Sequence, residues 1–251
     1  MIYCFLFGLV KKVDQVLEKK WVKTANLVTS VSSYYTSKIS DFVGVPGEVL
    51  LNGFEAYQLG DVKPDSEYFS LCFNGTLYQT QQVETLIDGI KLFIDENPSL
   101  ALKMNFPGLA FSVEQDARVK DLITGYEKYF WISDRIKKEE VIKIQQQSHL
   151  LVMINHQGLK GIPSSKLYEY LSLKRHVLVV NGDNDIVDDT VRKANVGKVA
   201  NSASEVADVL KEYWTLFQAD IDNAVISHNL SSIFKIEKSV ESLSEKLDRL
   251  T

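Results

Sequence analysis

The chain has 251 residues, of which 45% are hydrophobic and 24% are charged, the composition of an ordinary globular protein with one large or two small domains. Its formal net charge of -5 gives no general reason to expect nucleic-acid binding. With only Cys4 and Cys72, we expect neither a disulfide framework nor a cysteine-based zinc site, so a reducing, cytoplasmic setting fits best.

The N-terminal segment, Met1–Val10, is almost wholly apolar, but it is too short to span a bilayer, which takes about 20 residues. Val10, Val13, Leu17 and Trp21 then recur at helical spacing among several lysines. Two interpretations stay open: a helix packed on a neighbouring domain, or a basic amphipathic helix on an anionic membrane surface. The localisation that follows is cytoplasmic, with peripheral contact at the inner face of the membrane under the second interpretation.

Residues 25–54 predict a strand, a helix and a short second strand. The first strand is expected at Ala25–Val31, and the helix at Tyr34–Val43 with Ser32 or Ser33 as its cap. The second strand lies within Pro46–Phe54 and ends in an Asn-Gly turn.

From residue 66 onward, short apolar runs alternate with amphipathic ones. Strands are predicted at Tyr68–Phe73, Leu100–Asn105, Lys128–Ile132, Leu150–Ile154, Val177–Val180 and Lys198–Ala200. Helices are predicted at Gln82–Glu96, Val113–Thr124, Lys137–Gln147, Ser165–Leu173 and Asp185–Ala194, then from Ser202 or Ser204 to about Phe217, and in the tail at Ser231–Leu250. Apolar strands separated by helices indicate an α/β fold, a doubly wound, Rossmann-like parallel sheet, here with flanking helices at both ends.

The run from Ser164 to Leu171, ahead of an apolar strand, predicts a loop that enters a helix with Glu169 inside it. The start of a helix offers unpaired N–H groups and a partial positive charge, which suit a phosphate. A carboxylate farther along the same helix can accept hydrogen bonds from sugar hydroxyls. The pattern therefore predicts a nucleotide-sugar site.

The same stretch resembles a helix of the form P-S-K-L-x-E-Y-L in the retaining glycosyltransferases of the GT-B fold (glycosyl transferases group 1, family 4 type). The matching residues are Pro163, Ser164, Ser165, Lys166, Leu167, Glu169, Tyr170 and Leu171. The order of elements in residues 25–54 resembles the end of the acceptor-side domain and the linker of these enzymes. The resemblance extends from about Trp21 to the tail and is specific around 163–171 and 48–54.

This resemblance implies three regions: residues 1–54 as a remnant of the acceptor-side domain and linker, 55–217 as the donor-binding domain, and 218–251 as C-terminal helices. A two-domain enzyme of this fold needs another Rossmann-like domain before residue 1. We therefore expect the chain to be the C-terminal, donor-binding half of such an enzyme, with the acceptor-side residues of the site in the other domain and the catalytic residues unknown.

The implied reaction moves a hexose from a nucleoside diphosphate sugar, of the UDP or GDP type, to a glycan or lipid-linked acceptor in polysaccharide biosynthesis. It needs no metal and no cofactor. Two alternatives stay open. The chain would be a non-catalytic nucleotide-sugar-binding subunit that docks to a separate acceptor-domain subunit, or a pseudoenzyme that lacks its acceptor domain.

The resemblance assigns roles to residues of the chain. Glu169 is expected to bind the ribose, and the diphosphate is expected to contact Ser164, Ser165 and Lys166 together with Gly75 and Thr76. The base is expected to contact Ile132, Arg135 and Ile136, and the sugar is expected to contact His156, Lys160 and Gly161. Three positions depart from the family: Thr76 and Gln81 stand where many relatives have Arg and Lys, and Gly161 stands where many have Glu. Either Lys166 and the neighbouring amides compensate, or donor binding is weak or lost.

Overall fold

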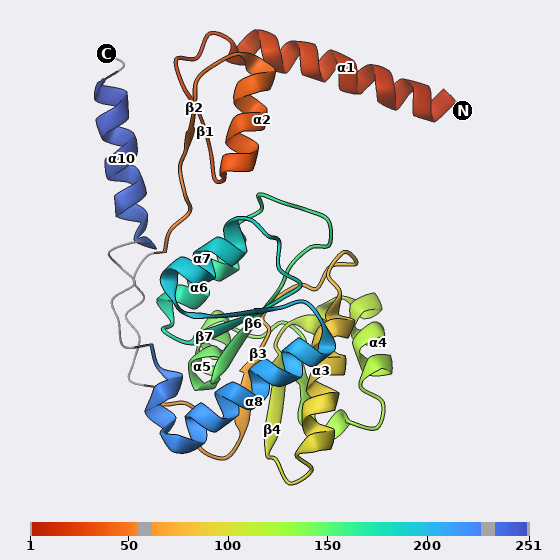
Figure 1. The fold of residues 1–251 in the computed structure, drawn as a ribbon. Helices are drawn as coiled ribbons and strands as arrows, with labels where there is room; N and C mark the ends of the chain where they lie inside the picture. The colour runs from red at the N-terminus through yellow and green to blue at the C-terminus, as the bar shows by residue number, and fades with distance from the viewer. Residues whose placement is uncertain (1, 55–61, 227–233, 250–251) are drawn as a thin grey trace.

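The computed structural model describes residues 2–54, 62–226 and 234–249 of the chain. Its elements form a large sheet domain and a smaller part beside it (Figure 1). The expected domain boundary between residues 54 and 55 is not tested by the fold, because residues 55–61 lie outside the described ranges.

The sheet domain alternates strands and helices along the chain, as the pattern of apolar runs predicts. Its strands are β3 (Phe69–Cys72), β4 (Leu102–Phe106), β5 (Phe130–Ile132), β6 (Leu150–Ile154), β7 (His176–Val180) and β8 (Gly197–Ala200). Its helices are α3 (Val83–Glu96), α4 (Val113–Leu122), α5 (Lys138–Gln147), α6 (Ser165–Ser172), α7 (Ile186–Ala194) and α8 (Ala203–Ala219), with short 3-10 turns at Leu109–Phe111, Glu127–Tyr129 and Ile221–Ala224.

The six strands pair in the order β5-β4-β3-β6-β7-β8, and every pair is parallel. Counted from β3, this is the strand order 3-2-1-4-5-6 of doubly wound, Rossmann-like sheets. The order of connections reverses between β3 and β6, where Leu71 pairs with Leu150 and Cys72 with Leu151. The predicted fold class is confirmed.

Helices cover both faces of the sheet because successive strand side chains point to opposite faces. Leu150, Val152 and Ile154 of β6 join a core with α3 and α8, while Leu151 and Met153 join a second core with α6 and α7. The two cores explain why β6 is apolar at every position. Figure 1 shows α3 and α8 side by side on one face and α6 and α7 on the other.

The smaller part consists of α1 (Ile2–Val22), β1 (Val28–Ser30), α2 (Ser33–Val43), β2 (Gly47–Val49) and the C-terminal helix α10 (Ile236–Asp248). Strands β1 and β2 pair in parallel. Ser32 caps α2 by accepting the Tyr35 N–H, and Gly44, with a φ of 72°, ends it. Both expected flanking helices are therefore present, although residues 231–233 and 250 of the predicted tail helix lie outside the described ranges.

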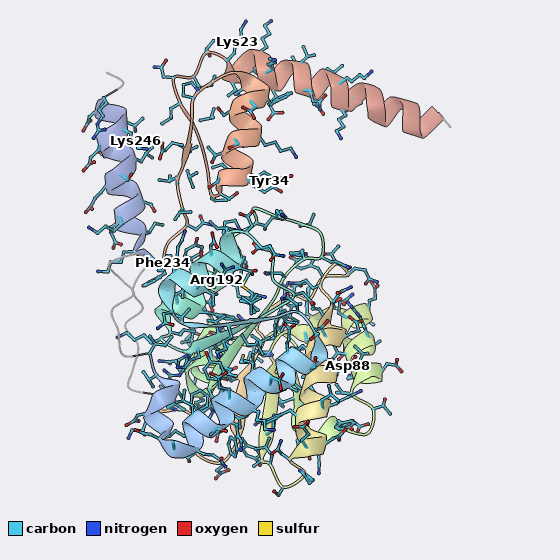
Figure 2. The ribbon with its side chains drawn as sticks, in the orientation of Figure 1. Lys23, Tyr34, Asp88, Arg192, Phe234 and Lys246 are labelled. Carbon is cyan, nitrogen blue, oxygen red and sulfur yellow. The ribbon has the colours of Figure 1, made fainter. Side chains whose placement is uncertain are left out.

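Helix α10 returns to the N-terminal elements rather than to the sheet domain. The Ser239 hydroxyl donates to the Leu51 carbonyl at 2.8 Å, and Lys246 forms an ion pair with Glu48. Phe54 bridges to Lys235, and its N–H donates to the Phe234 carbonyl at 2.9 Å. Figure 2 labels Phe234 and Lys246 near the two ends of this helix.

Helix α1 extends away from the rest of the molecule (Figure 1). Val16 is 67% exposed and Trp21 70% exposed, so the apolar face that the sequence predicts is open to solvent. Among the described helices, none is long and apolar enough to span a membrane. Packing on another domain and contact with a membrane surface both stay predictions for this helix.

Element boundaries follow the sequence closely. Strand β6 has the predicted bounds, and α3, α5 and α7 each begin one residue later than predicted. The chain before β5 forms a 3-10 turn at Glu127–Tyr129, so the strand is shorter than the predicted Lys128–Ile132. Strands β1 and β2 are likewise shorter than their apolar runs, because their ends turn into loops.

His149 makes the stability of the fold depend on pH. Its Nδ1 accepts the Ser70 N–H at 3.2 Å, and burial lowers the pKa of its imidazole to about 4. As the pH falls from about 6.5 to 4, the His149 imidazole takes up a proton in the unfolded chain but stays neutral in the folded protein. We expect this residue to remove about 3 kcal/mol from the free energy of unfolding over that interval.

The measurement is the free energy of unfolding by urea between pH 4.5 and 7.5, for the protein and for His149→Asn. The Asn side chain keeps an acceptor for the Ser70 N–H but does not titrate. The difference in the free energy of unfolding between the two proteins should change by most of the roughly 3 kcal/mol between pH 7.5 and pH 4.5. A constant difference would contradict the assignment.

Candidate functional site

A cavity of about 430 Å³ lies beyond the carboxyl ends of β3 and β6, where the order of connections reverses. Ligands of open α/β sheets bind at such switch points, because the two outgoing loops diverge and leave a crevice. The cavity is lined by Thr76, Tyr78, Gln81, Met153, Ile154, Asn155, His156, Leu159, Ile162, Ser164, Ser165, Lys166 and Asp183.

The first turn of α6 forms one wall of this cavity. Ser164 caps the helix, with its hydroxyl oxygen accepting the Lys166 N–H at 3.3 Å. Leu167, Tyr168, Tyr170 and Leu171 are buried against the sheet and fix the helix in place. The structure therefore brings together the three residues predicted for the diphosphate, Ser164, Ser165 and Lys166.

The Lys166 side chain turns from α6 toward the loop after β3. Its Nζ lies 4.3 Å from the centre of the Phe73 ring, and it would be 3.5 Å from a Cβ placed on Gly75. Burial lowers the pKa of this ammonium to about 8, against the opposing effect of Glu169. Lys166 is the one lysine or arginine in the described lining of the cavity.

The loop after β3 is held in place by the Gln81 side chain. The buried Gln81 amide donates to the Ile154 carbonyl at 2.5 Å, and its oxygen accepts the Tyr78 N–H at 2.9 Å. Gly75, with a φ of 95°, donates its own N–H to the Pro107 carbonyl. Of the two residues predicted for the diphosphate in this loop, Thr76 lines the cavity and Gly75 contacts Lys166.

His156 lies at the end of β6, at the mouth of the cavity. Its Nδ1 is 2.7 Å from the Thr80 hydroxyl, and its ring centre is 5.4 Å from that of Tyr78. Burial, and then the Lys166 charge, lower the pKa of the imidazole. A neutral ring at this position can exchange a hydrogen bond with a sugar hydroxyl.

Glu169 lies one helical turn beyond Lys166, behind the residues that line the cavity. Its Oε1 accepts a hydrogen bond from the Gln145 amide of α5 at 3.0 Å. The carboxylate is half-buried, and its charge affects the pKa values of Lys166 and Cys72.

The three residues predicted for the base lie at the edge of the sheet. β5 is the edge strand, two strands from the switch point, and Ile132 packs against the core there. Arg135 places its guanidinium 3.5 Å from the centre of the Phe111 ring. None of Ile132, Arg135 and Ile136 belongs to the described lining of the cavity.

Gly161 and Lys160 face the smaller part of the molecule instead of the cavity. A Cβ on Gly161 would lie 2.9 Å from both the Ser32 hydroxyl and the Tyr34 ring, at the start of α2. Figure 2 labels Tyr34 at the end of α2 nearest the sheet domain. Lys160 lines a second, open cavity of about 680 Å³ with Tyr34, Lys38 and Asp185.

The cavity residues that were not predicted from the sequence include Asn155 and Asp183. Each follows a buried strand, at most three residues after its end, which is the signal that could have found them. Asp183 accepts three backbone N–H groups from the start of α7, those of Asp185, Val187 and Asp188. In the described ranges, no group of three or more His, Cys, Asp or Glu side chains is arranged to hold a metal ion.

The contact of Gly161 with α2 predicts unequal effects of two alanine substitutions. Gly158 and Gly161 have φ values of 73° and 72°, but a Cβ on Gly158 meets nothing within 4 Å. Gly158→Ala should lower the free energy of unfolding by about 1 kcal/mol because of its backbone conformation alone. Gly161→Ala should lower it by an additional 1–3 kcal/mol, roughly, because the new side chain overpacks against α2. Urea unfolding of both variants measures the difference. Equal losses would show that the loop does not pack on α2.

No protein-family model matches the sequence, and no curated protein matches it significantly. Solved structures do match the fold. A glycosyltransferase from Rickettsia africae superposes with a TM-score of 0.68 at 14% identity, over 90% of this chain and 65% of that one. HepE from Anabaena in complex with UDP-glucose superposes with a TM-score of 0.65 at 14% identity, over 90% of this chain and 64% of that one.

TarM from S. aureus, as a point mutant in complex with fondaparinux, alpha-GlcNAc-glycerol and UDP, gives a TM-score of 0.64 at 12% identity, over 93% of this chain and 46% of that one. The chain thus spans less than two thirds of the length of each of these three structures. The structural similarity shows the fold: the six-stranded sheet with its flanking helices matches the Rossmann-like half of a GT-B glycosyltransferase.

Proposed function

We propose that the chain is the donor-binding part of a retaining glycosyltransferase that transfers a hexose from a nucleoside diphosphate sugar to a glycan or lipid-linked acceptor. The observation that carries this proposal is the cavity at the switch point, with the first turn of α6 on its wall. The similarity of fold to enzymes solved with UDP or UDP-glucose supports it.

The proposed chemistry places the leaving diphosphate against α6. Developing charge on the leaving group is stabilised by donors that are already oriented before the reaction. The first-turn amides and Lys166 provide such donors from a helix held rigidly by its buried face. His156, at the cavity mouth, is proposed to contact the sugar.

Glu169 is proposed to hold the ribose. Its Oε1 is oriented by Gln145, which leaves acceptor positions on the carboxylate for two sugar hydroxyls. Because Glu169 is behind the lining residues, the ribose would reach it over the first turn of α6. The base would then lie toward β4 and β5, where Ile132 ends the edge strand and Arg135 and Ile136 follow it.

A second candidate, a nucleotide-sugar-binding partner subunit or a pseudoenzyme, is favoured by the loop after β3. The Gln81 amide donates to the Ile154 carbonyl and accepts the Tyr78 N–H, so this side chain holds the loop and brings no positive charge to a phosphate. Weak nucleotide binding combined with activity only in the presence of a separate acceptor-domain protein would support the partner subunit. Absence of nucleotide binding would support the pseudoenzyme.

The direct test is calorimetric titration of the purified chain with UDP and with GDP, alongside Glu169→Ala. We expect one nucleotide to bind, and we expect the substitution to weaken that binding by about tenfold or more, because it removes charge-assisted hydrogen bonds. Glu139→Ala, an exposed change in the first turn of α5, is the matched control and should leave binding unchanged.

Two results would count against the proposal. If neither UDP nor GDP binds, the proposal that this chain contains a donor site is wrong. Equal binding by the protein and by Glu169→Ala would retain the site but remove Glu169 from it.

A further inference from the structure

Helix α1 carries a continuous apolar face that is open to solvent. At 3.6 residues per turn, its exposed apolar side chains fall within an arc of about 140° around the helix axis. They are Val10, Val13, Val16, Leu17 and Trp21. Single exposed apolar residues are normal on a protein surface, but a contiguous stripe marks a surface that binds something.

The apolar face of α1 points away from the rest of the molecule. The Lys19 Nζ lies 6.0 Å from the centre of the Phe42 ring, so α2 contacts the side of α1 that carries Lys19. Leu17, in the middle of the apolar arc, is about 160° around the helix from Lys19. Figure 1 shows α1 extending away from the sheet domain, and Figure 2 labels Lys23 at the end of the helix next to α2. The partner of this face therefore comes from outside the described parts of the chain.

The charge of this segment is opposite in sign to that of the chain. Residues 1–23 contain five lysines and two acidic residues, which gives them a net charge of +3, while the whole chain carries -5. The rest of the chain therefore carries -8. A basic segment on an acidic protein directs that segment, and not the whole molecule, toward a negatively charged surface.

The lysines border the apolar face along one edge. Lys12 and Lys23 lie beside Val16 at this edge, and both are exposed. Asp14 and Glu18 lie beyond the opposite edge, past Trp21. When the lysine edge faces a negatively charged surface, the two acidic side chains are thus turned away from it.

Lys20 distinguishes a lipid partner from a protein partner. It is exposed and lies inside the apolar arc, between Val16 and Val13 around the helix. Lysine is depleted from the cores of protein interfaces, because a buried ammonium needs an anion to compensate its lost solvation. At a membrane surface, the alkyl chain of a lysine can lie along the apolar face while its ammonium reaches the lipid phosphates. Trp21 also suits this boundary, since an indole ring is both apolar and a hydrogen-bond donor.

We propose that α1 docks on an anionic lipid surface. Its apolar face lies at the boundary between acyl chains and headgroups, and Lys12, Lys20 and Lys23 contact the headgroup phosphates. The sequence extends the uncharged part of the helix through Ile2–Leu9, which contains no Asp, Glu, Lys or Arg. This inference goes beyond the proposed function and does not depend on nucleotide binding.

The experiment is co-sedimentation of the full chain with two kinds of vesicle, pure phosphatidylcholine and phosphatidylcholine with about one third phosphatidylglycerol, at about 0.1 M and about 0.5 M NaCl. The test variant combines Lys12→Glu, Lys20→Glu and Lys23→Glu. The matched control combines Lys63→Glu, Lys137→Glu and Lys143→Glu, which change the net charge equally at exposed lysines outside α1. Thermal unfolding establishes that both variants are folded.

We expect the chain to sediment with the anionic vesicles, and to bind phosphatidylcholine at least about tenfold more weakly. Binding should weaken at the higher salt concentration, because salt screens the lysine charges. The test variant should weaken binding by about tenfold or more, and the control variant should bind like the unchanged chain.

The fluorescence of Trp21 reports where the helix lies. Trp131 and Trp214 are half-buried in the sheet domain, whereas Trp21 is exposed, so the anionic vesicles should shift the emission of Trp21 to shorter wavelength. Trp21→Phe should lose this shift and still sediment with the vesicles. An unchanged emission of the bound chain would show that the apolar face of α1 is not inserted.

Four results would overturn the proposal. The first is no binding to anionic vesicles, and the second is equal binding to both kinds. The third is an equal loss of binding in the test and control variants, which would assign the effect to net charge and not to α1. The fourth is self-association of the chain, measured by analytical ultracentrifugation, that Leu17→Asp abolishes, because a second copy would then cover the face. The comparisons of vesicles and of salt concentrations need no variant.

Discussion

The pairing of β3 with β6 is the contact on which the site depends. Only two residue pairs join these strands, Leu71 with Leu150 and Cys72 with Leu151, yet the whole sheet is divided there into two halves. The pair is fixed at both ends. At one end the His149 ring accepts the Ser70 N–H, and at the other the Gln81 amide reaches the Ile154 carbonyl. The two strands that border the crevice are thus joined by side-chain hydrogen bonds as well as by their backbone pairing.

Much of the fold could be predicted from the sequence because its causes are local. Apolar runs separated by helical stripes indicate a covered parallel sheet, and serines mark helix starts at Ser32, Ser164 and Ser202, all three of which cap a helix. The position of the cavity follows from the same pattern, since parallel strands present their carboxyl ends at one edge. The α6 residues predicted for the diphosphate line that cavity.

The rest of the site depends on contacts between distant segments, which no local pattern encodes. Gly161 has a positive φ and packs against Tyr34, which lies far earlier in the chain, so the absence of a side chain there is a steric requirement of the structure. The position of Asn155 in the cavity lining likewise depends on where β6 ends relative to α6, and its Nδ2 has no hydrogen-bond partner among the described residues. Arg135 resembles a free cation in the sequence, but it stacks on Phe111. The roles proposed for Glu169 and for the base residues stay predictions.

The return of α10 has a mechanical consequence. Phe54 and Phe234 lie in the same core as Tyr168 of α6, and they are hydrogen-bonded to each other where the chain leaves and re-enters the smaller part. Two backbone segments that are hydrogen-bonded to each other restrict the relative movement of the parts they join more than a single segment would. Because Phe54 and Phe234 pack beside Tyr168, the connection to the smaller part is anchored against the helix that forms the cavity wall.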